Sequence, residues 1–408
     1  MKELVRERYL SKIRPFYHDD GMIKVMTGVR RCGKSTIMSQ IMNELITEGV
    51  EPSSIVYLDL DSKRYRRIKE SDKLEQIIDE LVGDSGALSY LFIDEVQNVN
   101  GFESLVNAYR NDGVSVFITG SNSYLLSGDL VTKLTGRYIE FRIMTFSFSE
   151  VREFHMINDL PFDRHSEFNN YLKYGGYPKM FEYTNIEEKL LYLRSVIAET
   201  IGKDILQSRK VRNRALLNKV LNYLISSPAI EVSSPSIVRY LRSDGIKTLP
   251  NTINGYLELI FSSKVAIKCE RYDIHGKKSL KTLYKSYLAD PSIHSSYPSS
   301  RNNLMIGHLI ENIVFNEFLS RGYDVSVGKL SGGEIDFVVS HGDRTAYVQV
   351  AYLMPNDETI KREFEPLLRI RSGFPKYVIS MDPVKMDRDG VRMLNLLDDF
   401  LLGDGFTL

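Results

Sequence analysis

One nonapeptide organises the first part of this 408-residue chain: Gly28-Val29-Arg30-Arg31-Cys32-Gly33-Lys34-Ser35-Thr36. It directly follows an apolar run, Ile23–Thr27, and leads into a helical pattern that begins near Lys34. A glycine-rich turn between a buried strand and a helix lets successive backbone N–H groups and the helix N-terminus face phosphate oxygens. The spacing therefore predicts a loop that binds the phosphates of a nucleotide.

Within this loop the residue types predict separate tasks. The ammonium group of Lys34 is expected to neutralise charge on the β- and γ-phosphates, and the hydroxyl of Ser35 to ligate Mg²⁺. ATP and Mg²⁺ are therefore the expected cofactors. Arg30 and Arg31 contact either the phosphates or the C-terminal part of the chain, and the sequence leaves both interpretations open. The predicted cofactor-binding residues are Gly28, Arg30, Arg31, Cys32, Gly33, Lys34, Ser35 and Thr36.

A pair of carboxylates, Asp94 and Glu95, follows a second buried strand, Leu91–Ile93. In open α/β sheets, ligands bind at the carboxyl ends of the strands. Asp94 is expected to hold Mg²⁺ through a water molecule, and Glu95 to orient or deprotonate the attacking water. A glutamate directly after the Mg²⁺-binding aspartate favours hydrolysis over a slow binary switch.

Two further positions each have a functional and a structural interpretation. The strand Val116–Thr119 runs into Ser121 and Asn122, where a polar side chain would sense the γ-phosphate or the attacking water. A plain turn is the alternative. Arg137 precedes a fifth predicted strand, and it is either an arginine finger for a neighbouring subunit or part of a surface salt bridge.

Composition restricts the class of protein. Apolar residues make up 43% of the chain and charged residues 26%, which is typical of globular proteins and excludes disordered and fibrous ones. Lys+Arg and Asp+Glu are both 53, so the surface is not uniformly basic. Only two cysteines, Cys32 and Cys269, favour a reducing compartment. The charged start of the chain is unlike a signal peptide, and no stretch reaches the ~20 apolar residues of a membrane helix, so a cytoplasmic protein without a membrane partner is expected.

The order of apolar runs and helical patterns along the chain predicts the domain organisation. Short buried runs alternate with helical patterns over residues 1–145, which predicts an α/β core with a parallel sheet. Helical patterns fill residues 146–210. Three short helices and a hairpin follow over residues 211–295, in the order of a winged helix. A segment rich in proline and serine leads into a small α/β unit over residues 296–408.

The chain resembles a widespread bacterial and archaeal family of AAA-type P-loop ATPases whose C-terminal half is a domain of unknown function. The resemblance extends nearly end to end. The motifs that carry it are Gly28–Thr36, Asp94–Gln97, Thr119–Ser121, Thr135–Arg137, Phe146–Glu150, Gly175–Pro178, Lys285–Asp290, Gly307–Asn312 and Glu334–Phe337. It implies an ATPase core with a helical lid, a winged helix and a C-terminal α/β domain with a restriction-endonuclease-like fold.

The resemblance also points to the positions of a nuclease site in that last domain. Nucleases with this fold use a helix Glu, a strand Asp and, on the next strand, an acidic residue two positions before a lysine. Glu311 and Asp336 take the first two places and Gln349 the third, but Ala351 stands where the lysine is expected. We therefore expect a vestigial nuclease site in a domain that binds DNA without cleaving it. A packing domain with structural carboxylates is the alternative.

Basic residues gather in two segments, residues 203–219 and the predicted hairpin at 264–285. A basic hairpin with interleaved tyrosines suits contacts to the DNA backbone, which do not depend on base sequence. The predicted recognition helix, Pro250–Phe261, has no arginine, so strong base readout is not expected. Winged helices also bind proteins, and that alternative stays open. The predicted DNA-binding residues are Lys268, Arg271, Lys277, Lys278 and Lys281.

These observations together predict a Mg²⁺-dependent ATPase that acts on or is bound to DNA as a homo-oligomer. Branched DNA, such as a Holliday junction, is indicated only by analogy of fold. Two rival functions are an ATP-driven switch that binds proteins and a nuclease gated by ATP.

Overall fold

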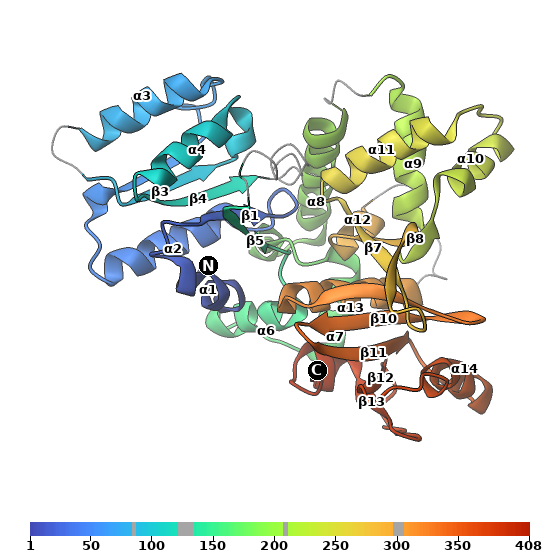
Figure 1. The fold of residues 1–408 in the computed structure, drawn as a ribbon. Coiled ribbons are helices and arrows are strands. Elements are labelled where there is room, and N and C mark those ends of the chain that lie inside the picture. The colour runs from blue at the N-terminus through green and yellow to red at the C-terminus, as the bar shows by residue number, and fades with distance from the viewer. Residues whose placement is uncertain (84–86, 121–133, 135, 207–210, 297–305) are drawn as a thin grey trace. The chain divides into compact units, whose positions relative to one another are not determined.

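The computed structural model describes residues 1–83, 87–120, 134, 136–206, 211–296 and 306–408, and at 281–282 only the backbone (Figure 1). These residues form two compact units. The N-terminal unit comprises residues 3–143 and 262–264, and the C-terminal unit comprises residues 1–2, 144–261 and 265–408. Among the helices that the structure describes, none has the length and apolar character needed to cross a membrane.

A five-stranded parallel sheet forms the centre of the N-terminal unit, as predicted, with strand order β2-β3-β4-β1-β5. Because β4 lies between β1 and β3, the loop after β1 and the carboxylates after β3 meet at one edge of the sheet, on either side of the end of β4. The strands are β1 (Ile23–Thr27), β2 (Ile55–Asp59), β3 (Tyr90–Asp94), β4 (Ser115–Gly120) and β5 (Tyr138–Arg142).

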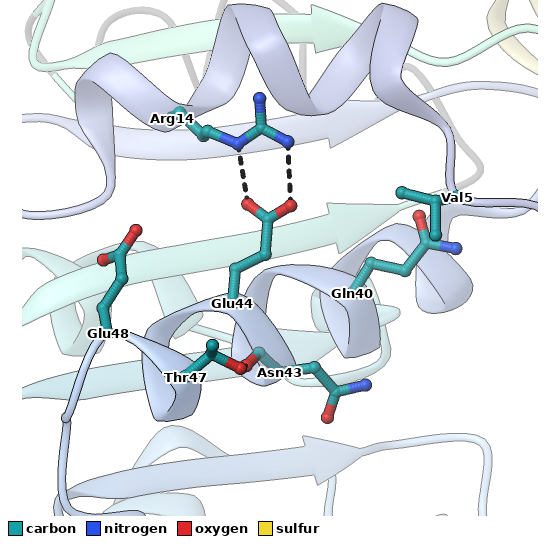
Figure 2. A pocket seen from close by; sticks show the side chains of 7 residues that line it. All are labelled: Val5, Arg14, Gln40, Asn43, Glu44, Thr47 and Glu48. Carbon is teal, nitrogen blue, oxygen red and sulfur yellow. Dashed lines mark hydrogen bonds and ion pairs between the residues drawn. The ribbon is translucent and has the colours of Figure 1, made fainter.

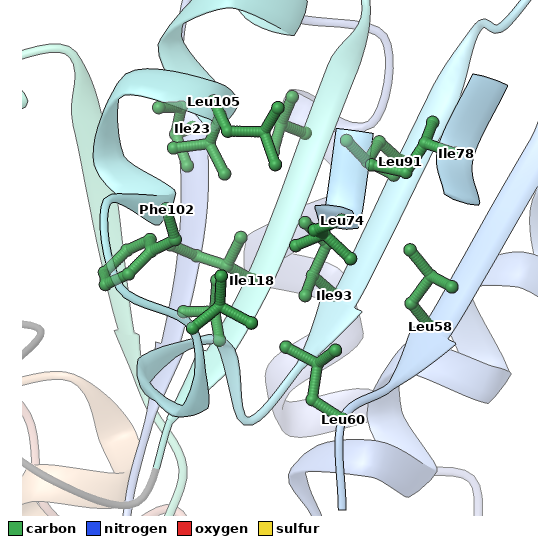
Figure 3. Close-up of a cluster of buried hydrophobic side chains, with 14 of the residues drawn as sticks. Ile23, Leu58, Leu60, Leu74, Ile78, Leu91, Ile93, Phe102, Leu105 and Ile118 are labelled. Atoms are coloured by element: carbon green, nitrogen blue, oxygen red, sulfur yellow. The ribbon is translucent and has the colours of Figure 1, made fainter. Parts of the chain in front are cut away.

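Apolar side chains pack on both faces of this sheet, which is why its central strands read as continuous apolar runs. Leu74 and Phe102 pack with Ile93 and Ile118 of the strands in one cluster (Figure 3). On β3 and β4, the rings of Phe92 and Phe117 stack with their centroids 4.5 Å apart. The helices of this unit are α1 (Glu7–Ile13), α2 (Lys34–Thr47), α3 (Ser71–Val82) and α4 (Phe102–Asn111).

The C-terminal unit begins with helices, and the first of them explains a motif of the sequence. The hydroxyl of Ser147 accepts a hydrogen bond from the backbone N–H of Glu150, and the Glu150 carboxylate accepts one from the N–H of Ser147, which is a capping box. The helices are α6 (Phe148–Ile157), α7 (Arg164–Tyr174), α8 (Ile186–Thr200), α9 (Arg214–Ser226), α10 (Ser234–Ser243), α11 (Pro250–Ser262), α12 (Pro291–Ser295), α13 (Ile306–Arg321) and α14 (Asp357–Leu368).

One eight-stranded sheet runs through this unit in the order β13-β12-β11-β10-β9-β7-β8-β6 (Figure 1). The hairpin of β7 and β8 joins it because β7 pairs with β9 in parallel, with Arg271 opposite Val327. The predicted hairpin and the predicted C-terminal α/β unit therefore belong to one sheet, although a domain boundary was predicted between residues 295 and 296. The strands are β6 (Ile230–Val232), β7 (Ala266–Asp273), β8 (Lys278–Leu288), β9 (Asp324–Leu330), β10 (Gly333–His341), β11 (Arg344–Ala351), β12 (Lys376–Ser380) and β13 (Val391–Asn395).

Two further motifs, the glycine pair at 175–176 and Asp290, pack closely against each other. Asp290 is fully buried, and its carboxylate accepts hydrogen bonds from the N–H of Gly176 at 2.8 Å and the N–H of Ser292 at 2.9 Å. A Cβ on Gly175 would lie 1.7 Å from Asp290 Oδ1, and one on Gly176 would lie 2.1 Å from the carbonyl oxygen of Phe146. Both glycines are therefore needed for close packing, and this motif has a structural role.

We expect Gly176→Ala to lower the free energy of unfolding by about 1–3 kcal/mol or more, because the added methyl group overlaps a backbone carbonyl that cannot move freely. Gly307→Ala is the matched control, since a Cβ there meets no atom within 4 Å. Denaturant unfolding of both variants measures the difference. Equal midpoints for the two variants would contradict this account of the motif.

Candidate nucleotide site and carboxylate centre

The predicted phosphate loop lies between β1 and α2, at the carboxyl edge of the sheet. Gly28 has φ 156°, and a Cβ there would lie 2.1 Å from the carbonyl oxygen of Ile143 and 2.8 Å from the Cys32 sulfur. Gly33 caps the N-terminus of α2 with φ 104°. Both conformations favour glycine, and the N-terminus of a helix after a glycine-rich loop is suited to bind anions.

Lys34 begins α2, and its ammonium group folds over the loop. It donates to the carbonyl oxygens of Gly28 at 3.1 Å and Val29 at 3.4 Å, and lies 3.9 Å from Glu95 Oε1. The residue is 4% exposed. A positive charge is therefore held at the loop and faces the predicted catalytic carboxylate.

Asp94 ends β3, and hydroxyl groups from three directions surround its carboxylate. Thr119 on β4 donates to Oδ1, Tyr57 on β2 donates to Oδ2 at 3.4 Å, and Ser35 on α2 donates a further hydrogen bond. Burial raises the pKa of Asp94. The structure thus brings Ser35 and Asp94, the two predicted Mg²⁺ ligands, into direct contact, and this set of oxygen donors fits a hard cation.

Glu95 follows with φ 56°, a left-handed conformation that is costly for a residue with a Cβ and is common at functional sites. Its backbone N–H donates to the hydroxyl of Thr119 at 3.0 Å. Its Oε2 accepts a hydrogen bond from the Gln97 amide at 2.5 Å, while Oε1 faces Lys34. The carboxylate that is expected to act on water is therefore held in a defined position.

Of the remaining predicted loop residues, some pack in the interior and others lie at the surface. Cys32 is completely buried, burial raises the pKa of its thiol, and its carbonyl oxygen accepts a hydrogen bond from the buried Arg6 at 2.9 Å. Arg30 forms an ion pair with Asp61 at 3.2 Å. Arg31 is exposed, and Thr36 is partly buried on α2. Cys32 thus supports the loop by packing beneath it.

Ser121 and Asn122, the two predicted sensor residues, lie outside the described residues. Arg137 is exposed, and its carbonyl oxygen accepts a hydrogen bond from the N–H of Ile23, at the start of β1. It therefore lies at the amino edge of the sheet, opposite the loop, and is not part of the site of its own chain. A role as arginine finger would require a neighbouring subunit and stays a prediction.

Three residues of the site had no role in the sequence-based prediction: Tyr57, Gln97 and Thr119. Thr119 was visible only as part of a Thr-Gly-Ser motif. Because β4 lies between β1 and β3, the end of β4 is next to the end of β3, and there Thr119 contacts the Asp94 carboxylate and the backbone N–H of Glu95.

A hollow of about 330 Å³ on the same unit lies away from this site (Figure 2). It opens beside the C-terminal half of α2, whereas the phosphate loop precedes the first residue of that helix. Inside it, Arg14 donates to the two carboxylate oxygens of Glu44 at 2.9 and 2.8 Å. This bidentate ion pair joins the segment after α1 to α2, which is a structural task.

In the C-terminal unit, the predicted vestigial nuclease residues come together. The Gln349 amide oxygen accepts a hydrogen bond from the N–H of Asp336 at 3.3 Å, and Asp336 and Glu311 both contact the ammonium group of Lys285. Glu334 joins them, and we call Glu311, Glu334 and Asp336 the carboxylate centre. The sequence had indicated Lys285 as a basic residue of the hairpin and as part of a motif of the family resemblance, but not as a partner of these acids. The predicted lysine position, Ala351, belongs to an apolar cluster.

The predicted DNA-binding residues have different environments. Lys277 and Lys278 are exposed at the turn between β7 and β8. Lys268 pairs with Glu270 at 3.0 Å, and Arg271 pairs with Glu231 at 2.6 Å and with Glu334 at 3.2 Å. The Lys281 side chain is outside the described residues. Lys277, Lys278 and Lys268 are exposed, while Arg271 is engaged within the fold.

Comparisons with known proteins match two parts of the chain to family models and nearly all of it to relatives. A family model described as "AAA domain" matches residues 20–152, and another described as "Domain of unknown function (DUF8612)" matches residues 165–301. The chain is 33% identical over 395 residues to an uncharacterized protein of Haemophilus influenzae, covering 96% of this chain and 97% of the relative. It is 26% identical over 392 residues to uncharacterized protein MJ1544 of Methanocaldococcus jannaschii, covering 92% and 82% respectively.

Among solved structures, the chain is similar to AMPPCP-bound DnaA from Aquifex aeolicus, with a TM-score of 0.33 and 15% identity over 63% of this chain and 94% of that one. It is also similar to the Aeropyrum pernix ORC1 protein in complex with DNA, with a TM-score of 0.32 and 10% identity over 72% and 93%. At these TM-scores the likeness carries no argument about function.

We expect Thr119→Val to lower the rate of ATP hydrolysis roughly 10- to 100-fold, because it removes a hydroxyl that contacts Asp94 and the backbone of Glu95, and hydrogen bonds to charged groups contribute about 1.5–3 kcal/mol. Thr119→Ser keeps the hydroxyl and should stay within a few-fold of the unmodified protein. Steady-state hydrolysis assays at saturating ATP provide the test. If both substitutions reduce the rate equally, the hydroxyl is not the group that matters.

Proposed function

We propose that this chain, which belongs to the same family as the uncharacterized Haemophilus influenzae protein and contains an AAA domain, is a Mg²⁺-dependent ATPase that acts on or is bound to DNA. The observation that carries the proposal is the meeting of Lys34, Ser35, Asp94 and Glu95 at one edge of the parallel sheet. Both cysteines are free and buried, which supports a cytoplasmic location.

The hydrolytic reaction follows from what each side chain is placed to do. The N–H groups of the loop and the ammonium group of Lys34 bind the phosphate oxygens. To do so, the ammonium group leaves the carbonyl oxygens of Gly28 and Val29 and contacts the more negative phosphate. Ser35 and Asp94 would hold Mg²⁺, which when bound neutralises charge on the phosphates. Glu95 accepts a proton from the attacking water, and Thr119 holds the backbone that positions it.

An oligomer is the setting in which Arg137 acquires a role. The residue lies exposed at the amino edge of the sheet, at the opposite end of the strands from the phosphate loop of its own chain. Supplied to the γ-phosphate of a neighbouring subunit, it would stabilise negative charge in the transition state. We therefore propose a homo-oligomer with nucleotide bound between protomers.

The DNA part of the proposal is based on the hairpin and the helices before it. The order α9, β6, α10, α11, β7 and β8 is that of a winged helix, in which the hairpin is the wing. Lys277 and Lys278 are exposed at its tip, and the exposed Lys329 lies beside them because it is paired with Asp273. Such a tip suits contacts to phosphates and so predicts binding by backbone and shape.

Branched DNA, including Holliday junctions, is proposed as a substrate class by analogy with nucleases of the restriction-endonuclease-like fold, to which we assign the sheet from β9 to β13. In our proposal this domain binds DNA without cleaving it, because Ala351 stands in place of the expected lysine. ATP-gated cleavage abolished by Asp336→Asn would replace this proposal with an active nuclease.

The first experiment measures ATP hydrolysis by the full chain alone and with single-stranded, duplex, forked and four-way-junction DNA. We expect Mg²⁺-dependent hydrolysis that one DNA form stimulates, and a loss of about 100-fold or more in Glu95→Gln, which keeps the size of the side chain but cannot take up a proton. Hydrolysis that depends on Glu95 but is indifferent to every DNA would favour a switch that binds proteins.

The second experiment tests the hairpin. We expect Lys277→Glu with Lys278→Glu to weaken duplex binding at least tenfold and to reduce the salt dependence of the binding constant, because fewer counterions are released from the DNA. Lys361→Glu with Arg371→Glu, two exposed positions outside the hairpin, changes the net charge equally and serves as the control. Fluorescence anisotropy at several salt concentrations measures both. Equal effects from the two pairs would indicate that only net charge matters.

A further inference from the structure

One ammonium group lies among the three acids of the carboxylate centre. Lys285 Nζ is 3.0 Å from Glu311 Oε1, 3.2 Å from Glu334 Oε1 and 3.5 Å from Asp336 Oδ1. The Lys285 side chain is 9% exposed, so the cation is enclosed by its partners. Lys285 is on the hairpin strand β8, whereas Glu311 is on α13 and the other two acids are on β10.

The curvature of the sheet makes this contact. Two strands, β9 and β7, separate β10 from β8 in the sheet order, yet Lys285 reaches Asp336. Register shifts interrupt the β10–β9 pairing between Ile335 and Val338 and the β7–β8 pairing between Glu270 and Arg271. Bulges bend and twist strands, which is compatible with the approach of Lys285 on β8 to Asp336 on β10.

Three further donors contact the acids of the centre. Tyr287, two residues after Lys285 and therefore on the same face of β8, donates to Glu311 Oε1 at 2.7 Å. The N–H of Val350 donates to Asp336 Oδ2 at 2.9 Å, and Arg271 donates to Glu334 Oε2 at 3.2 Å. Burial raises the pKa of Glu311 to about 8 and also raises the pKa of Asp336. Acids in such a place need a cation close by if they are to be charged.

We propose that the ammonium group of Lys285 occupies the position of a divalent metal ion in the carboxylate centre, and that the centre binds Mg²⁺ or Mn²⁺ only when this charge is removed. Carboxylate oxygens are ligands that such cations prefer, and the centre offers three carboxylates. Its oxygens stand 3.0–3.5 Å from Nζ, which are ion-pair distances, whereas Mg²⁺ binds oxygen at about 2.0–2.1 Å. The acids are thus spaced for an ammonium group, and they must close in around a metal ion.

The inference explains how a nuclease-like centre keeps its acids without cleaving DNA. A second cation beside Lys285 would be repelled in a buried site where charges interact strongly. The lysine comes from the hairpin, so the same ion pairs also join the predicted wing to β10 and α13. This inference does not depend on ATP hydrolysis, and its test contains no nucleotide.

The test is a titration of the full chain with Mn²⁺, in which the electron paramagnetic resonance signal of free Mn²⁺ measures how much of the ion is bound. Every variant carries Asp94→Asn, so that the proposed Mg²⁺ position of the phosphate loop does not contribute. We expect no saturable site in this background and one Mn²⁺ per chain after Lys285→Met. Adding Asp336→Asn to Lys285→Met should abolish that binding. Lys219→Met, which removes a lysine from an exposed ion pair with Asp244 in the same unit, should create no site.

Two results would overturn the inference. One is a Mn²⁺ site that is already present with Lys285 in place and is lost on Asp336→Asn. The other is a folded Lys285→Met protein that binds no Mn²⁺. If Lys285→Met is too unstable for titration, its melting temperature decides the question, since a metal that binds only the folded chain must raise it. We expect a rise that grows with Mn²⁺ concentration in Lys285→Met and none with Lys285 present. No rise in Lys285→Met would refute the proposal.

Discussion

The hydroxyl of Thr119 donates a hydrogen bond to Asp94 and accepts one from the backbone N–H of Glu95. This pair of contacts joins β4 to the end of β3, where the chain turns through the left-handed conformation of Glu95. Ser35 reaches Asp94 from α2, so the phosphate loop is connected to the same network. The phosphate loop and the two acids Asp94 and Glu95 thereby keep fixed relative positions.

Lysine and carboxylate meet in both parts of the chain, with different consequences. Lys34 Nζ lies 3.9 Å from Glu95 Oε1 and donates hydrogen bonds to carbonyl oxygens of the loop. A neutral carbonyl is a weaker partner for a cation than a carboxylate or a phosphate. Lys34 can therefore turn to a phosphate when one arrives. Lys285 Nζ lies 3.0 Å from Glu311 Oε1, and Glu334 and Asp336 are also close to it. If the ammonium group moved away, buried carboxylates would be left without an opposite charge, which is energetically costly. The first arrangement is suited to bind a ligand and the second to keep one out.

Several motifs that look functional in the sequence have structural tasks. Ser147 and Glu150 form a capping box, and Asp290 fills the space that Gly175 and Gly176 leave open. Arg271 has a similar task, since a residue expected to bind DNA forms ion pairs with Glu231 and Glu334. A charged residue or a glycine motif in this chain is therefore informative about function only when its partners are known.

Local patterns in the sequence determined the parallel sheet, its strands to within about a residue, and the phosphate loop with Lys34, Ser35, Asp94 and Glu95. They could do so because strand burial, loop glycines and helix starts are properties of neighbouring residues. Tertiary structure alone decided that Thr119, Tyr57 and Gln97 complete the site, that the hairpin continues the C-terminal sheet, and that Lys285 takes a place among Glu311, Glu334 and Asp336. These contacts join residues far apart in sequence through strand order and sheet curvature, neither of which leaves a periodic signal in the chain.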